Sequence, residues 1–124
     1  MMGCNSHITV EVKDTDYPSL GWQCWAEHVM ESRCYDLYAA MAGVRGFGPE
    51  PKGMPLDRSL VSKCFHDEHS EHSITWLTPK EYAEAYNAAG MVVSKEWEAI
   101  LKCLFVLEEV FGEGNVRMII GFDN

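Results

Sequence analysis

The stretch His7-Ile8-Thr9-Val10-Glu11-Val12-Lys13 alternates apolar and polar side chains, the pattern of a β-strand with one buried face. Ile8, Val10 and Val12 are expected to face the core, leaving His7, Thr9 and Glu11 on the other side. Residues 115–122 alternate in the same way, with Val116, Met118, Ile120 and Phe122 on one side. The fold therefore depends on how the segments between these two strands cover the sheet.

Between them the sequence predicts further strands at residues 22–30 and 72–77, and four helices. Each helix start is indicated by a capping residue, at Ser32, Asp57, Thr78 and Ser94. The segment Thr78-Pro79-Lys80-Glu81 is a capping box with proline at the first helical position. We predict a single α+β domain over residues 1–124, with a small, mainly antiparallel sheet of three to five strands packed by about four helices, all against one face.

Composition restricts the class of protein. A chain of 124 residues with 47% hydrophobic content is long enough for one domain with its own core. A formal charge of -9 and a pI near 4.9 argue against a general nucleic-acid binder, which needs a basic surface. No apolar run is long enough to predict a membrane span. Only three residues precede Cys4, so we expect no secretory leader, five reduced cysteines and a cytoplasmic protein.

A dense group of potential metal ligands lies at His66-Asp67-Glu68-His69-Ser70-Glu71-His72. Neutral histidine and thiolate cysteine are the usual zinc ligands, and a zinc site normally draws them from two segments. The second segment is expected at the N-terminus, so the predicted ligands of a zinc-type site are Cys4, His7, His69 and His72. A hydrolase or lyase centred on His66, His69 and His72 is one interpretation. Acid–base chemistry without a metal, with Asp67, Glu68 or Glu71 beside a histidine, stays open.

A local basic segment stands out in this acidic chain. Four of the ten positive charges, Arg33, Arg45, Lys52 and Arg58, fall within 26 consecutive residues (33–58). The glycine-rich stretch 43–48 places Arg45 among backbone amides, although it lacks the lysine and hydroxyl residue that end a P-loop. Such a segment predicts binding of a phosphate or carboxylate group, and solvated loop charge is the alternative.

Five segments of the chain together resemble a group of small uncharacterised proteins of bacteriophages and prophages. They are the start 2–8, the helix 33–45, the loop 51–55, the segment 69–78 and the ending 121–124. These proteins open with Met-Gly-Cys-Asp-x-His and carry an Asp/Gly-x-His-Ser-x-Ser-Trp-Leu-Thr segment. The chain departs from them at Asn5, where aspartate is usual, and in the spacing of the His-Ser segment. If that aspartate binds a metal in the group, Asn5 weakens the metal interpretation.

The resemblance implies a small accessory protein acting on host defence from the host cytoplasm. We therefore expect it to sequester a small phosphorylated or nucleotide-like ligand. Cations and hydroxyls would suit phosphate and ribose, and aromatic rings would stack on a base. The predicted ligand-binding residues are His7, Arg33, Tyr35, Arg45, Lys52, His69, Ser70, Ser73 and Trp76. The zinc-type hydrolase or lyase, and an acidic inhibitor of a basic host protein, are the alternatives, and a homo-oligomer with a pocket at its two-fold interface stays open.

Overall fold

The computed structural model describes residues 3–90 and 94–123. One four-stranded sheet has the order β2-β1-β4-β3, and every pair of neighbours is antiparallel. The strands are β1 (Asn5–Lys13), β2 (Trp22–Met30), β3 (His72–Leu77) and β4 (Val116–Asp123). The helices are η1 (Pro18–Leu20), α1 (Tyr35–Ala42), α2 (Leu60–Asp67), α3 (Pro79–Ala89) and α4 (Lys95–Phe111). The predicted α+β class is thereby confirmed.

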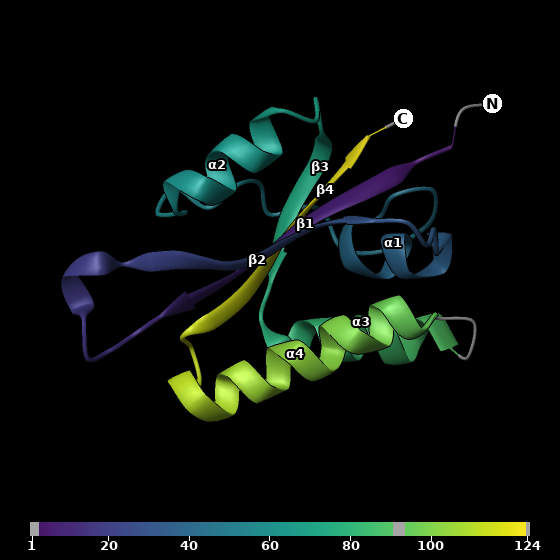
Figure 1. The fold of residues 1–124 in the computed structure, drawn as a ribbon. Coiled ribbons are helices and arrows are strands. Elements are labelled where there is room, and N and C mark those ends of the chain that lie inside the picture. The colour runs from purple at the N-terminus through teal and green to yellow at the C-terminus, as the bar shows by residue number, and fades with distance from the viewer. Residues whose placement is uncertain (1–2, 91–93, 124) are drawn as a thin grey trace.

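Three helices, α1, α3 and α4, cover one face of the sheet (Figure 1). As predicted, Ile8, Val10 and Val12 of β1 face this side, and each is at most 3% exposed. The β4 side chains Met118, Ile120 and Phe122 join them in the hydrophobic core. The Tyr82 hydroxyl within this core is satisfied, because it donates to the Trp97 carbonyl at 2.8 Å. The edge-to-face pair of Tyr38 and Phe122 ties α1 to β4.

The fourth helix, α2, lies on the opposite face (Figure 1), so the expectation that all helices pack against one face is wrong. The reason lies in the outward row of β1. His7, Thr9 and Glu11 are all at most 3% exposed, although the alternation of the strand placed them away from the core. Alternation identifies two faces of a strand, but a second covering layer depends on where a distant helix folds back.

Helix boundaries agree in part with the sequence. The capping box is confirmed: Thr78 accepts from the Glu81 amide, and the Glu81 carboxylate accepts from the Thr78 amide. The expected cap at Ser32 is wrong, since α1 starts after Cys34 and the Ser32 amide donates instead to Glu96. The expected cap at Asp57 is also wrong. Ser59 caps α2 by accepting from the Ser62 amide.

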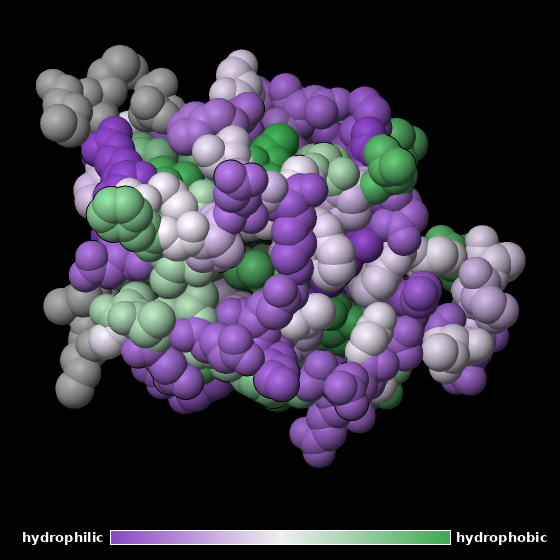
Figure 2. All heavy atoms as spheres, turned by 180° about the vertical axis from the view of Figure 1, so that it is seen from behind, coloured by the Kyte–Doolittle hydropathy of each residue, from purple (hydrophilic) through white to green (hydrophobic). Residues whose placement is uncertain are grey.

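One face of the molecule is largely polar. On the face shown in Figure 2, hydrophilic side chains predominate and apolar ones form small separate groups. On α4, Trp97 and Leu104 are buried, whereas Val110 is 71% exposed. None of the helices in residues 3–90 and 94–123 is long and apolar enough to span a bilayer.

Candidate metal centre

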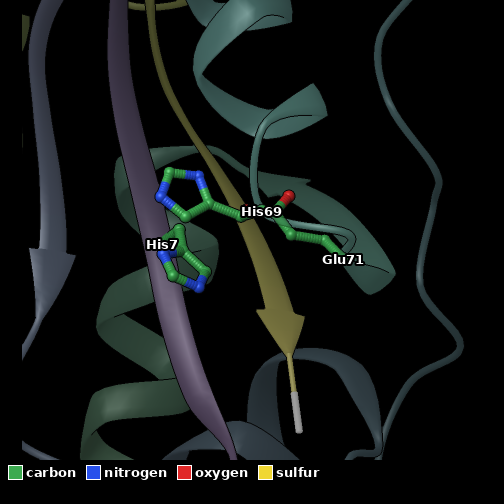
Figure 3. A group of neighbouring side chains, drawn as sticks. All are labelled: His7, His69 and Glu71. Atoms are coloured by element: carbon green, nitrogen blue, oxygen red, sulfur yellow. The ribbon is translucent and has the colours of Figure 1, made fainter.

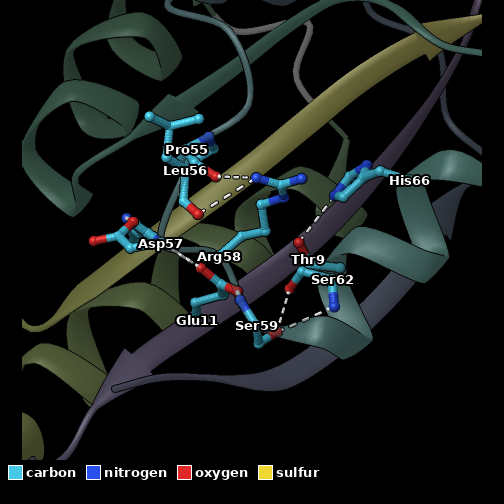
Figure 4. Close-up of polar contacts among 10 residues, drawn as sticks. Thr9, Glu11, Pro55, Leu56, Asp57, Arg58, Ser59, Ser62 and His66 are labelled. Carbon is cyan, nitrogen blue, oxygen red and sulfur yellow. Dashed lines mark hydrogen bonds and ion pairs between the residues drawn. The ribbon is translucent and has the colours of Figure 1, made fainter.

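A layer of buried polar side chains lies between α2 and the sheet. We call it the polar seam and define it as Thr9, Glu11, His66 and Arg117, together with Ser62. Thr9 hydrogen bonds to Nε2 of His66 at 2.9 Å, and the Ser59 amide donates to Glu11 at 2.8 Å (Figure 4). Because buried polar groups must find partners, these bonds fix α2 over β1 in one position.

The polar seam explains why α2 shows an unexpected burial pattern. Its apolar residues Leu60 and Val61 are 74% and 56% exposed, whereas Ser62 and His66 are buried. Since the sheet face below is itself polar, the helix presents the hydrogen-bonding groups of Ser62 and His66 to it, while Leu60 and Val61 face solvent.

Three side chains at one end of the polar seam, His7, His69 and Glu71, form a group that could hold a metal ion. We call this group the metal cluster. One ligand atom from each lies within 4.8 Å of the others. His7 comes from β1, whereas His69 and Glu71 come from the turn between α2 and β3 (Figure 3). The two imidazole rings are stacked, with centroids 4.0 Å apart. Two segments distant in sequence thus supply the donors, as in most zinc sites.

Hydrogen bonds determine which nitrogen of His7 can donate an electron pair. Nε2 of His7 contacts a carboxylate oxygen of Asp123 on β4. In a neutral ring that contact places the proton on Nε2 and the lone pair on Nδ1. Nδ1 of His7 is buried and has no hydrogen-bond partner among the described residues. A carboxylate behind a metal-binding histidine is the usual way in which proteins orient that ligand.

His69 is held in the complementary way. Its Nδ1 lies 2.7 Å from the Phe65 carbonyl oxygen, which can only accept, so Nδ1 carries the proton and Nε2 the lone pair. The next residue, Ser70, has a φ of 50°, a left-handed conformation that reverses the chain between His69 and Glu71. This turn brings both side chains to the same side of the sheet.

Glu71 is fixed from two directions. Nδ1 of His66 donates to its carboxylate at 2.8 Å, and His66 is in turn held by Thr9. Gly121 of β4 provides the space, because a Cβ at that position would overlap the Glu71 carboxylate. Gly121 pairs with His7 across the β1–β4 ladder, which places Glu71 beside that histidine.

The charge balance of this cluster favours a cation. The Glu71 side chain is fully buried, and Asp123 is 29% exposed. Within the described residues both carboxylates form their ion pairs with histidines, not with lysine or arginine. With neutral rings, Glu71 in the cluster and Asp123 beside it together carry two negative charges, and a buried charge needs a partner or a metal. A divalent cation would balance them.

The predicted metal ligands divide between two places. The structure brings His7 and His69 together, with Glu71 as the third member of the cluster. Cys4 is buried in the hydrophobic core, and burial raises the pKa of its thiol, which opposes formation of the metal-binding thiolate. His72 is exposed, and its Nδ1 contacts the Ser73 hydroxyl. Neither belongs to the cluster.

The predicted ligand-binding residues fall into three groups. His7, His69 and Ser70 lie at the metal cluster, and Ser73, with a φ of 55°, lies in β3. Tyr35 and Arg45 line a cleft of about 750 Å³ between α1 and α3, and the Arg45 guanidinium lies 4.9 Å from the Tyr35 ring centroid.

The remaining residues lie outside that cleft. Arg33 extends over Gly3 and donates to Asn5 at 3.0 Å. Lys52 lies 4.0 Å from the ring centroid of Trp76 and pairs with Glu81 at 2.7 Å. The nine residues therefore do not line one common cavity.

No known protein family, curated protein or solved structure matches the chain. The resemblance to phage proteins stays a prediction, and two of its residues, Met2 and Asn124, lie outside the described part of the chain. From the sequence, Glu71 was considered only as an acid–base partner of a histidine, and His66 only as a member of a possible centre with His69 and His72. The alternation of β4 places Gly121 and Asp123 on one face, but their role depends on which strand pairs with β4.

Proposed function

We propose that the protein binds a divalent transition-metal ion through Nδ1 of His7, Nε2 of His69 and the carboxylate of Glu71. The observation that supports this most strongly is the orphaned, buried Nδ1 of His7, a residue of the three-member group that could hold a metal ion. Asp123, the Phe65 carbonyl and His66 each hold one donor in the orientation that leaves its electron pair available. Two histidines and a carboxylate are a donor set that zinc and non-haem iron use.

Three protein donors correspond to a catalytic rather than a structural site. Structural zinc sites use four protein ligands, whereas catalytic ones use three and keep a position for water or substrate. We therefore propose a metal-dependent hydrolase or lyase as the function of this centre. The metal would lower the pKa of its bound water and polarise the bond to be broken. Asp123, partly exposed, lies at the side of the cluster that solvent reaches.

The location of this activity is part of the proposal. All five cysteines are free. Free thiols persist in reducing compartments, which supports a protein that works in the cytoplasm. A role in a phage-infected host follows only from the resemblance in sequence.

The direct test is metal content and affinity of untagged protein. We expect about one zinc, iron or manganese ion per chain after purification, or after reconstitution of chelator-treated protein. His69→Asn and Glu71→Gln should each remove this binding. His72→Asn and Cys4→Ser are matched controls, because both residues were candidates from the sequence and neither belongs to the cluster.

The outcomes separate the two ligand sets. Retention of the metal in Glu71→Gln together with its loss in His72→Asn would show that the sequence-based set is right and the cluster is not the centre. Less than about one metal in ten chains after reconstitution would overturn the proposal altogether. Far-ultraviolet circular dichroism of each variant confirms that the fold is retained.

A further inference from the structure

A second cleft lies on the same side of the sheet as the polar seam, toward the opposite end of β1 and β4 from the metal cluster. Its volume is about 690 Å³, within the range of small-molecule sites. Two half-buried tryptophans, Trp22 of β2 and Trp76 of β3, line it. The polar residues in its wall are Lys13, Asp57, Thr78 and Arg117. Strands from both edges of the sheet thus contribute an aromatic ring to one cavity.

Arg117 lies in the wall of this cleft as a fixed charge. Its side chain is only 6% exposed, and it pairs with Glu11 at 2.7 Å and with Asp57 at 2.9 Å. Its guanidinium lies 3.9 Å from the ring centroid of Trp22 and 6.0 Å from that of Trp76. A guanidinium held between two indoles and two carboxylates has little freedom to turn away, so the wall is pre-organised.

The electrostatics of the cleft differ from those of the whole protein. The chain has a formal charge of -9, but the charged residues lining the cleft are Lys13, Arg117 and Asp57, and with Glu11, the second partner of Arg117, the two cations and two carboxylates balance. Nζ of Lys13 lies 5.1 Å from the Trp22 centroid, at the same wall as Arg117. Lys52 lies over Trp76 without lining the cleft. An anionic group attached to an aromatic ring matches this combination.

Thr78 lies in the wall of the cleft with its hydroxyl already engaged. Its Oγ1 accepts from the Glu81 amide, and its side chain also hydrogen bonds to the Glu81 carboxylate. The aromatic rings and the cations are therefore the groups that suit a planar base carrying a phosphate.

We propose that this cleft binds a nucleoside phosphate, with the base against Trp76 and the phosphate toward Lys13 and Arg117. This inference is independent of the metal centre, since it uses none of the metal cluster's residues. It differs from the sequence-based expectation in its residues: Trp76 is retained, and Trp22, Lys13 and Arg117 are new.

The test is calorimetric titration of chelator-treated protein with adenosine monophosphate, adenosine and inorganic phosphate. We expect the monophosphate to bind more tightly than either of its parts. Trp76→Ala and Lys13→Met should each weaken its binding by about tenfold or more. Trp25→Leu is the matched control, because Trp25 is exposed and contacts Phe111 edge-to-face outside the cleft.

A further variant separates the two clefts. Arg45→Met removes the cation of the cleft between α1 and α3 and should leave monophosphate binding unchanged. Loss of binding in Arg45→Met, equal weakening by Trp25→Leu, or no heat of binding with the folded wild-type protein would each overturn the proposal. Lys13→Met carries the test if Trp76→Ala does not fold, since Lys13 lies at the end of β1 outside the hydrophobic core.

Discussion

The carboxylate of Glu71 occupies the space that a side chain at Gly121 would need. The glycine lies within β4, two residues before the end of the strand, and has no turn to form there. Its absent side chain is what allows a carboxylate from the α2–β3 turn to reach the face of β4. The metal cluster therefore depends on a residue that contributes no donor atom.

Gly121→Ala should displace Glu71 and destabilise the protein by about 1–3 kcal/mol, as overpacking of a tight interior does. Metal affinity should fall as well, because Glu71 could no longer approach His7. Urea denaturation with and without zinc measures both effects. Ile119→Val, a buried change on the same strand face, is the control: it should cost about 0.5–1.5 kcal/mol and leave the zinc-dependent stabilisation intact. Unchanged zinc stabilisation in Gly121→Ala would contradict the assignment of Glu71.

Asp123→Asn should weaken metal binding by about 10–100-fold without abolishing it, since Asp123 orients His7 and is not itself a donor. The amide can still contact Nε2, but it no longer supplies a negative charge behind the ring. Competition with a chromogenic chelator measures the change. Asp67→Asn, in an exposed ion pair with Lys63 on α2, should leave the affinity unchanged. Equal effects of the two substitutions would indicate bulk charge rather than orientation of His7.

Glu11→Gln should destabilise the fold by about 3–5 kcal/mol, because it leaves the buried Arg117 guanidinium without its fully buried partner. Lys102→Ala is the comparison: it breaks an exposed pair with Glu98 on α4 and should change stability by less than about 1 kcal/mol. Chemical denaturation of both variants measures the difference. If Glu11→Gln lowered the free energy of unfolding by less than about 1 kcal/mol, the Glu11–Arg117 pair would not stabilise the polar seam.

Glu96 should contribute to acid sensitivity. Burial raises the pKa of its carboxyl, but hydrogen bonds from His28 and the Ser32 and Glu31 amides outweigh burial and hold the pKa below 4.5. A carboxyl whose pKa is lowered in the folded state stabilises the protein at pH values above its pKa in the unfolded state. This stabilisation is lost as the pH falls through the folded-state pKa.

Glu96→Gln should therefore lower the free energy of unfolding near neutral pH and flatten its fall in acid. Denaturation curves at a series of pH values down through 4.5 and below measure this. Glu113 is exposed in the turn before β4, so Glu113→Gln should leave the fall of the free energy of unfolding in acid unchanged. If the free energy of unfolding falls with the same slope in acid in Glu96→Gln and in the wild type, Glu96 does not contribute to acid sensitivity.

Patterns within single segments predicted much of the fold. The alternation of β1 and β4 and the capping box at Thr78 appear in the structure where the sequence places them. The caps at Ser32 and Asp57 were wrong because α1 and α2 begin later, after Cys34 and Ser59. The Ser32 amide donates to Glu96, and the Asp57 carboxylate pairs with Arg117, so tertiary contacts hold both residues outside the helices.

The sequence by itself determined that this is one α+β domain, that His7 lies on the outward row of β1, and that histidines and carboxylates gather at residues 66–72. Only the tertiary structure decided what these groups do. Antiparallel pairing placed Asp123 and Gly121 beside His7, and the fold of α2 over the outer face brought His69 and Glu71 to it. The physical reason is that periodicity fixes the direction of a side chain within its own segment, whereas its partners come from segments distant in the chain.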